Sequence, residues 1–305
     1  MSQVATTAKI GIKDFKAADP RWCTGCGDYG IVVALRRFMA DKQLDPASVV
    51  NVSGIGCSGR IPHYINTYGF HGVHGRAIPI AMGVALARPD LKLFVESGDG
   101  DALSIGGNHL IHGINKNFNC VFILTDNQIY GLTKNQTSPT SRQGLVTNTQ
   151  PQGSYLRPIN PIQFALGVGA SFVASTAEWL TGHMIDVLDR AYQHPGFSFV
   201  HISQRCPKFN PTAFDAKRSD TITFLENDLK GVKADLKFAP DAKVVQHDPS
   251  NLGEAFKYAM SDSEDKYLGI VYTDATKPRY ECLVKSVVDN TPQKSRSQLF
   301  DSYKI

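Results

Sequence analysis

The run LKLFVESGDGD, residues 91–101, contains the features that decide the fold. Its first five residues are mostly apolar and predict a short buried strand, and its end is a turn of alternating glycine and aspartate. A second junction of this kind occurs in VFILTDNQIYGLT, residues 121–133, where apolar residues lead directly into the tripeptide TDN. Both segments therefore predict a buried strand that carries polar side chains at its carboxyl end.

The sequence on either side alternates between helical and strand patterns. Apolar residues at helical spacing predict helices at 28–41, 77–87, 108–115 and 180–191, and short apolar runs predict further strands at 48–52, 172–174 and 197–202. This alternation indicates an α/β fold, in which a parallel sheet has helices on both faces. Ligands of such sheets bind beyond the carboxyl ends of the strands, where GDGD and TDN lie.

The length of 305 residues allows one large domain with a substantial extension. The alternating pattern weakens after Asn210, and polar residues become more frequent. We therefore predict a ligand-binding domain at 1–210 and a C-terminal extension at 211–305. We expect the extension to pack on the main domain or on a partner subunit.

Composition and charge exclude several classes of protein. The net charge is +4, and residues 211–305 contain nearly equal numbers of basic and acidic side chains, so a nucleic-acid partner is not expected. The longest apolar stretch, Ile78 to Ala87, is interrupted by Pro79 and Gly83, whereas a membrane-spanning helix needs about 20 residues. The first residues lack the apolar core of a secretory signal. We therefore expect a cytoplasmic protein without a membrane partner.

The strand ends at GDGD and TDN carry oxygen ligands of the kind that Mg²⁺ prefers. Asp99 offers a carboxylate and Asn127 a side-chain carbonyl, and a buried diphosphate needs a divalent cation to neutralise it. Glycines at 98, 100 and 131 would allow the backbone to approach phosphate oxygens closely. The alternative is that GDGD is only a strand-to-helix turn with a capping aspartate. The second segment, 29 residues further on (127 − 98), favours the metal–diphosphate interpretation.

Four of the six cysteines lie in turns next to glycine or proline. Cys23 and Cys26 form a CxxC unit, Cys57 lies in GCSG, and Cys206 precedes a proline. Structural zinc sites more often use paired CxxC units, whereas an iron–sulfur cluster accepts scattered thiolates. The spacing alone leaves an iron–sulfur cluster, a zinc site and unligated thiols open.

Several motifs together resemble one protein family. They are WCTGCGDYG (22–30), GIGCSGR (54–60), INTYGFHGVHGRA (65–77), ESGDGDALSIGGNHLIHGI (96–114) and TDNQIYGLTKNQTSPTS (125–141). In this order they look like the β subunit of 2-oxoacid:ferredoxin oxidoreductases, in particular the two-subunit archaeal form. The resemblance covers roughly residues 17–210. It implies the pyrophosphate-domain fold that binds thiamine diphosphate.

The resemblance also implies roles for individual residues. Cys23, Cys26, Cys57 and Cys206 would hold one 4Fe–4S cluster, and Asp99, Asn127 and the main-chain carbonyl of Ile129 would hold Mg²⁺. His74 would contact the cofactor or substrate as a catalytic residue. The residues expected to contact thiamine diphosphate are Ile55, Gly56, Cys57, Ser58, His74, Gly98, Gly100, Asp101, Gly131, Leu132 and Thr133.

The activity implied by the resemblance is the CoA-dependent oxidative decarboxylation of 2-oxoacids, such as pyruvate, 2-oxobutyrate or 2-oxoglutarate, to acyl-CoA and CO₂. Electrons would leave one at a time through the cluster to ferredoxin. Thiamine enzymes also need a glutamate at the aminopyrimidine, but Glu96 lies on the strand of the diphosphate motif, at the wrong end of the cofactor. The family resemblance implies that a larger α subunit supplies this glutamate from its pyrimidine-binding domain.

Two other functions remain open at this point. A thiamine-dependent decarboxylase or synthase subunit without a cluster would explain the two strand ends but not the cysteines. A zinc-stabilised binding module without catalytic activity would explain some cysteines but neither strand end.

Overall fold

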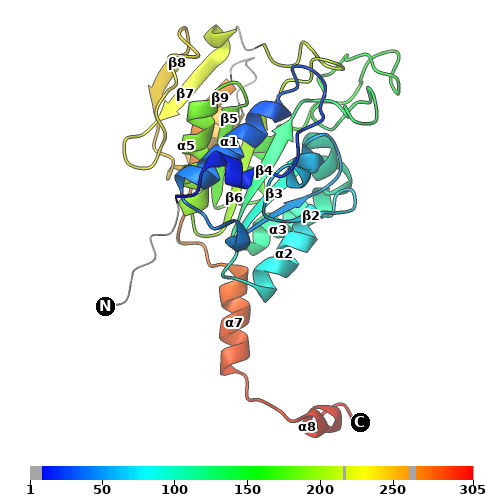
Figure 1. Ribbon diagram of the computed structural model, residues 1–305, viewed down its shortest axis with the longest axis vertical. Helices are drawn as coiled ribbons and strands as arrows, with labels where there is room; N and C mark the ends of the chain where they lie inside the picture. Colours follow the sequence, from blue (N-terminus) through cyan, green and yellow to red (C-terminus); the bar gives the residue numbers. More distant parts are fainter. Residues whose placement is uncertain (1–8, 216–217, 261–265, 305) are drawn as a thin grey trace.

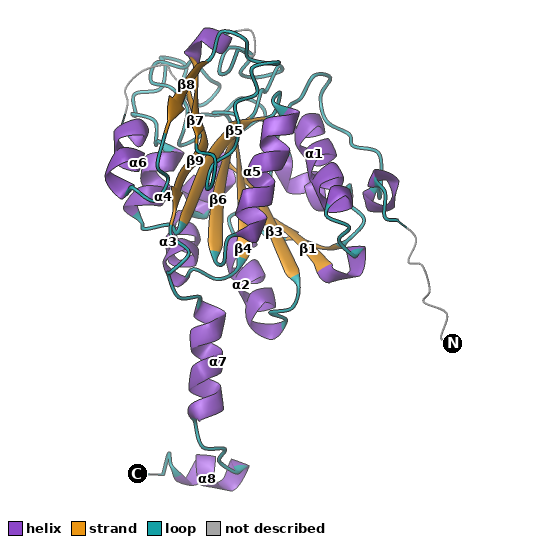
Figure 2. Ribbon diagram, turned by 90° about the vertical axis from the view of Figure 1, so that its left-hand side faces the viewer, coloured by secondary structure: helices purple, strands orange, loops and turns teal. Residues whose placement is uncertain are grey.

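The computed structural model describes residues 9–215, 218–260 and 266–304, which form a nine-stranded sheet covered by helices on both faces (Figures 1 and 2). The strand order is β2-β1-β3-β4-β6-β5-β9-β7-β8. All neighbouring strands are parallel except β5 and β9, which are antiparallel. The predicted α/β fold with a mostly parallel sheet is confirmed.

The strands are β1 Val49–Ser53, β2 Tyr68–His71, β3 Lys92–Gly98, β4 Cys120–Asp126, β5 Phe172–Ala177, β6 Phe197–Ser203, β7 Ile222–Glu226, β8 Lys243–Gln246 and β9 Lys266–Thr273. The α-helices are α1 Asp28–Asp41, α2 Ala77–Ala87, α3 Gly107–Lys116, α4 Pro161–Gly167, α5 Thr181–Gln193, α6 Leu252–Ala259, α7 Tyr280–Asn290 and α8 Arg296–Asp301. A short π-helical turn, Asp101–Ile105, precedes α3.

Side chains on alternate positions of the strands face two separate cores. On β3, Leu93 and Val95 pack with residues of α2, α3, α4 and α6, whereas Phe94 packs with residues of α1 and α5. Fully burying one large apolar side chain contributes about 1.5–3 kcal/mol, so both faces stabilise the sheet. This packing holds β1, β3, β4 and β6 side by side and fixes where their carboxyl ends lie.

The strand β3 is longer than its apolar pattern predicts. It continues through Glu96, Ser97 and Gly98, because β1 pairs with it as far as Glu96 and β4 pairs with it as far as Gly98. The predicted helices 28–41 and 77–87 are confirmed at the same bounds.

The chain beyond residue 210 adds β7, β8 and β9 to the same sheet. The helices α7 and α8 then project away from it (Figure 1), with exposed apolar side chains such as Leu283, Val287 and Phe300. No helix within the described ranges is both long and apolar enough to cross a membrane.

Glu96 is an ionisable group inside the sheet. It is fully buried, and neither carboxylate oxygen has a hydrogen-bond partner in the described part of the chain. Burial raises the pKa of Glu96 from 4.5 to about 8. The unfolded chain therefore releases this proton near pH 4.5, whereas the folded chain keeps it up to about pH 8, and folding loses stability across this interval.

We expect Glu96→Gln to remove this part of the pH dependence. Relative to the variant, the wild-type chain should lose unfolding free energy on the order of a few kcal/mol between about pH 4.5 and 8. A free-energy cost of burying the glutamine amide that does not depend on pH cancels, because the measured quantity is the change in unfolding free energy with pH. Chemical denaturation at several pH values checks this, and parallel curves for the two proteins would contradict it.

Candidate active site

Four neighbouring parallel strands end at the same edge of the sheet and carry the predicted site. The chain leaves β1 at 54–58, β3 at 98–101, β4 at 126–133 and β6 at 204–206. Because β1, β3, β4 and β6 are adjacent, residues up to 152 positions apart (206 − 54) meet here.

A first cavity, of about 70 Å³, lies between the ends of β1, β3 and β4. All residues predicted to contact thiamine diphosphate or Mg²⁺ line it, together with Tyr130. They are Ile55, Gly56, Cys57, Ser58, His74, Gly98, Asp99, Gly100, Asp101, Asn127, Ile129, Gly131, Leu132 and Thr133.

Asp99, which lines this cavity, forms a buried carboxylate pair with Asp126. The hydroxyl of Thr140 lies 2.8 Å from Asp99 Oδ2 and 2.7 Å from Asp126 Oδ1, and it can donate its one proton to only one of them. Burial, together with the charge of Asp126, raises the pKa of Asp99 to about 7. A bound cation would favour the ionised form of Asp99. The donor set therefore fits a divalent metal ion.

Asn127 is held in a fixed orientation by a tight turn. Its Oδ1 accepts a hydrogen bond from the Ile129 N–H (3.1 Å), and its Nδ2 donates to Gln204 Oε1 (2.8 Å). Gln128, between them, has a φ of 58°, in the left-handed region that non-glycine residues rarely adopt. The turn thus fixes which atom of the Asn127 amide is the available oxygen.

Asp101 connects three loops around the cavity. Its Oδ1 accepts hydrogen bonds from the backbone N–H groups of Ile55 (3.0 Å) and Gly75 (2.7 Å) and contacts His74 Nδ1, and its Oδ2 accepts from Ser97. Because the carboxylate accepts from Nδ1, the neutral His74 ring has its free lone pair on Nε2. Asp101 therefore positions both His74 and the loop after β1.

Tyr130 joins the GDGD turn to the segment after β4. Its hydroxyl donates to the Gly100 carbonyl (2.8 Å), and a Cβ at Gly100 would lie only 2.3 Å from Tyr130 Cε1. Glycine is therefore required at position 100 for the two segments to approach each other.

We expect Gly100→Ala to displace Tyr130 and to weaken binding of Mg²⁺–thiamine diphosphate by about 10- to 100-fold, because overpacking costs typically 1–3 kcal/mol. Isothermal titration calorimetry measures this affinity. The pair Tyr130→Ala and Gly100→Ala/Tyr130→Ala is the control, since the added methyl group should cost much less once the ring is absent. Wild-type affinity in Gly100→Ala would contradict the prediction.

A second cavity, of about 230 Å³, lies against the first and is lined by Cys23, Cys26, Cys57 and Cys206. The two cavities share Cys57, Asn127, Gly131 and Leu132 as a common wall. A Cβ on Gly131 would lie 3.5 Å from the Cys206 sulfur and 3.7 Å from the Cys57 sulfur. The cysteines predicted as one ligand set are therefore brought together next to the thiamine motif.

The local backbone directs these cysteines toward one space. Gly25, inside the CxxC turn, has a φ of 77°, and the Trp22 indole N–H donates to the Cys57 carbonyl (2.8 Å). Backbone N–H groups of residues 208–210 lower the pKa of the Cys206 thiol, although burial raises it by more. Burial raises the pKa of the Cys26 and Cys206 thiols, and that of Cys57 to about 12, so a bound positive centre would be needed to hold them as thiolates.

These features fit an iron–sulfur cluster better than a single zinc ion. In the described ranges, no three His, Cys, Asp or Glu side chains are arranged to hold one metal ion. Four thiols around a 230 Å³ space match the ligands and the room that a cluster requires. Cys120, within β4, and Cys282, on α7, lie outside this set.

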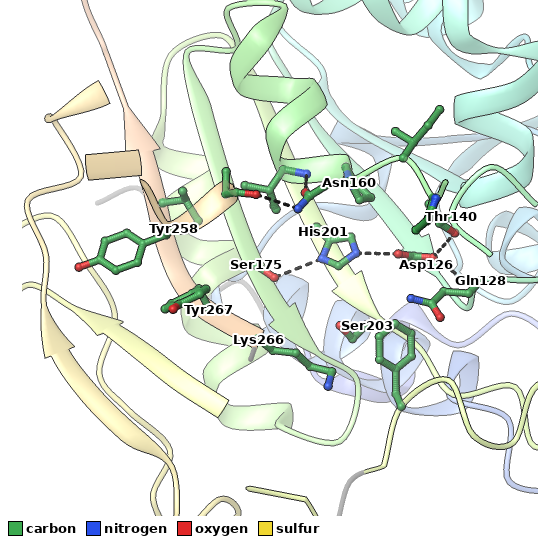
Figure 3. A pocket seen from close by; sticks show the side chains of 17 residues that line it. Asp126, Gln128, Thr140, Asn160, Ser175, His201, Ser203, Tyr258, Lys266 and Tyr267 are labelled. Carbon is green, nitrogen blue, oxygen red and sulfur yellow. Dashed lines mark hydrogen bonds and ion pairs between the residues drawn. The ribbon is translucent and has the colours of Figure 1, made fainter. Parts of the chain in front are cut away.

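A third cavity, of about 330 Å³, is lined by Asp126, Thr140 and His201 among other residues (Figure 3). His201 points into it, with Nε2 3.0 Å from Asp126 Oδ2 and Nδ1 3.2 Å from the Ser175 hydroxyl. None of its lining residues was predicted from the sequence as a ligand.

Three residues that hold the site together were not predicted from the sequence: Tyr130, Thr140 and Gln204. Tyr130 and Thr140 lie inside the motif at 125–141, and Gln204 directly follows β6 at the edge where ligands bind, so position was the available signal. The contact of Thr140 with Asp126, 14 residues away, depends on how the loop between them folds, which no strand or helix pattern predicts.

The residues that line the first cavity lie within a segment that matches a known domain family. Residues 54–202 match the model of the thiamine pyrophosphate enzyme C-terminal TPP-binding domain. A 2-oxoglutarate oxidoreductase subunit KorB of Mycobacterium tuberculosis is 51% identical over 209 residues, which is 68% of this chain and 56% of that relative. The chain thus matches little more than half the length of this relative.

Longer matches exist in archaea. The β subunit of 2-oxoacid:ferredoxin oxidoreductase 1 of Aeropyrum pernix is 35% identical, covering 85% of this chain and 80% of the relative. The corresponding β subunit of Sulfolobus sp is 36% identical, covering 90% and 89%.

A solved structure agrees with these relatives. The 2-oxoglutarate:ferredoxin oxidoreductase from Magnetococcus marinus, with 2-oxoglutarate, coenzyme A and succinyl-CoA bound, superimposes with a TM-score of 0.86 at 32% identity. The match covers 99% of this chain and 98% of that one. The chain therefore belongs to the β subunits of the 2-oxoacid:ferredoxin oxidoreductase family.

Proposed function

We propose that this chain holds thiamine diphosphate, Mg²⁺ and one 4Fe–4S cluster, and that with its partner it converts a 2-oxoacid and CoA to acyl-CoA and CO₂. The observation that supports this proposal most strongly is that the two cavities share a common wall. It consists of Cys57, Asn127, Gly131 and Leu132. Groups on either side of such a wall lie close enough for electrons to pass from substrate to cluster.

The residues of the first cavity divide the binding of the cofactor among them. Asp99, the Asn127 side chain and the Ile129 carbonyl would hold Mg²⁺, and glycine N–H groups would bind the diphosphate. Thiamine diphosphate supplies the electron sink that makes decarboxylation possible. His74, fixed by Asp101, would present Nε2 as an acceptor toward cofactor or substrate.

A partner subunit would complete the site. A cavity of 70 Å³ is far smaller than the roughly 300–1,000 Å³ of small-molecule sites, which supports an arrangement where another chain forms the opposite wall. Glu96 is fully buried in β3 and does not line the cavity, so a larger α subunit would supply the activating glutamate. The exposed apolar residues of α7 and α8 are where we expect part of this partner to pack.

Ferredoxin would accept the electrons at the second cavity. Arg21, Arg60, Lys134 and Lys208 line it, and no carboxylate does among the described residues. Such a basic rim favours an acidic electron carrier, and charge complementarity acts mainly on the association rate.

We expect Lys208→Glu to slow ferredoxin reduction by the assembled enzyme by about tenfold at low ionic strength, and less at high salt. Reduction of an uncharged dye should not change. Lys257→Glu, which makes the same charge change on α6 at an exposed position that does not line the second cavity, is the control. Stopped-flow kinetics distinguish the two variants, and equal ferredoxin rates would contradict this docking site.

Co-purification with the partner tests the function as a whole. The complex should reduce ferredoxin or a dye only when CoA and a 2-oxoacid are both present. A panel of pyruvate, 2-oxobutyrate and 2-oxoglutarate identifies the substrate; 2-oxoglutarate and CoA are bound by the Magnetococcus relative. Absence of CoA-dependent reduction with every 2-oxoacid would contradict the proposal.

A further inference from the structure

We propose that Gln204 couples the magnesium–diphosphate site to the cluster through its side-chain amide, so that binding of the cofactor raises the reduction potential of the cluster. This inference rests on the proposed function, because it requires both groups to be present. Gln204 follows β6 directly and is 1% exposed. Its backbone N–H donates to the Asp126 carbonyl at the end of β4 (2.9 Å), which fixes it between the two sites.

The Gln204 amide contacts a residue of each site. Its Oε1 accepts a hydrogen bond from Asn127 Nδ2 (2.8 Å), and Asn127 is a proposed Mg²⁺ ligand. Its Nε2 lies 3.4 Å from the Cys26 sulfur, a distance suited to an N–H···S hydrogen bond, and Cys26 is a proposed cluster ligand. The side-chain amides of Asn127 and Gln204 therefore form a continuous link from the proposed Mg²⁺ site to the Cys26 sulfur.

Backbone groups at both ends fix the direction of this chain of hydrogen bonds. The Ile129 N–H donates to Asn127 Oδ1, so Nδ2 must face Gln204. At the other end, Gln204 Nε2 also donates to the Arg205 carbonyl (2.8 Å). Rotating the Gln204 amide by half a turn would oppose two N–H donors at Asn127 and place an oxygen against both a carbonyl and a sulfur. The donor on the sulfur is therefore determined by the surrounding structure.

A hydrogen bond to a thiolate ligand affects the two redox states of a cluster differently. The reduced cluster carries one more negative charge, so an N–H donor stabilises it more and raises the reduction potential. Mg²⁺ at Asn127 Oδ1 would polarise the Nδ2–H bond, and the polarisation would pass through Gln204 to the Nε2–H at sulfur. The cluster then becomes the better electron acceptor when the cofactor is in place.

The same coupling must act in the opposite direction. By linkage, if Mg²⁺–thiamine diphosphate favours the reduced cluster, then reduction of the cluster tightens cofactor binding by the same factor. The cofactor would thus be held most firmly between the two one-electron steps.

Redox titration of the cluster in the anaerobic holo-complex, followed by electron paramagnetic resonance, tests the inference. In the wild-type protein the midpoint potential should be higher with Mg²⁺ and thiamine diphosphate than in their absence. Gln204→Met, which keeps the size but removes both hydrogen bonds, should lower the potential and remove the difference. Gln204→Glu, which keeps the acceptor for Asn127 but loses the donor to sulfur, should also lower it.

Asn51→Leu is the matched control. Asn51 is a buried amide on β1 that donates to the Thr67 hydroxyl (2.6 Å) and lines neither the first nor the second cavity. This variant should keep both the potential and its response to the cofactor.

The outcomes separate this inference from the proposed function. A wild-type protein without a cluster signal would contradict the proposed function itself. A normal cluster whose potential ignores the cofactor would overturn the coupling, and this comparison needs no variant. Unchanged potentials in Gln204→Met and Gln204→Glu would overturn the role of Gln204.

Discussion

We expect Asp99→Asn to reduce the affinity for Mg²⁺–thiamine diphosphate strongly. Without the cofactor, the variant should be at least as stable toward unfolding as the wild-type chain. Changing even the outer partners of a metal site typically costs about 10- to 100-fold in affinity, so loss of a direct carboxylate ligand should cost at least that. The unliganded chain should tolerate the change, because burial and the charge of Asp126 raise the pKa of Asp99 to about 7, which makes its ionised form unfavourable. Calorimetric titration and thermal denaturation of the same sample measure the two effects.

Asp126→Asn is the matched control for this prediction. Both carboxylates lie within hydrogen-bond distance of the Thr140 hydroxyl, but only Asp99 lines the first cavity. The Asp126 variant should therefore lose much less affinity. If both variants bound the cofactor as tightly as the wild-type protein, Asp99 would not be the metal ligand.

The second large effect is the loss of catalytic activity when the chain is assayed without its partner subunit. With thiamine diphosphate, Mg²⁺, a 2-oxoacid, CoA and an electron acceptor, the isolated chain should show no measurable turnover. General acid–base assistance is worth typically 10²–10⁴-fold, and a missing wall also loses the positioning of the substrate. Within the described chain, the Glu96 carboxylate is buried away from the cavity and cannot replace a glutamate at the aminopyrimidine.

Restoring the partner provides the control. Adding the purified α subunit to the same preparation should restore CoA-dependent electron transfer. A partner variant lacking the activating glutamate should still assemble but not restore it. Robust turnover by the single chain would show that the catalytic groups are all present here.

The sequence was most informative where local pattern and burial agree. The helices α1 and α2 begin and end where their apolar spacing predicts, because each buries one continuous face. The strands β7 and β8 were not predicted: they have 5 and 4 residues, and every residue of β8 is exposed or half-buried. A local sequence pattern could not predict the strand order either, because β9 lies between β5 and β7 in the sheet.

The residues of the candidate site also fall into two groups: those that a local motif identifies and those that depend on the folded structure. Residues inside contiguous motifs, such as the GDGD turn and the CxxC unit, could be identified because a short segment carries the whole signal. Gln204 could not, because its partner Cys26 lies 178 residues away and its role depends on the adjacency of β4 and β6. Spacing alone also could not choose between zinc and a cluster. The four thiols line one cavity in the structure, and this arrangement favours the cluster.

Iron and inorganic sulfide, measured together with thiamine diphosphate in one anaerobic preparation of the complex, test most directly whether cluster and cofactor share the wall formed by Cys57 and Gly131. We predict about four iron and four sulfide per chain. Cys57→Ser should reduce the iron and sulfide content and also disturb cofactor binding, because Cys57 lines both cavities. Protein that contained thiamine diphosphate but neither iron nor sulfide would contradict this account.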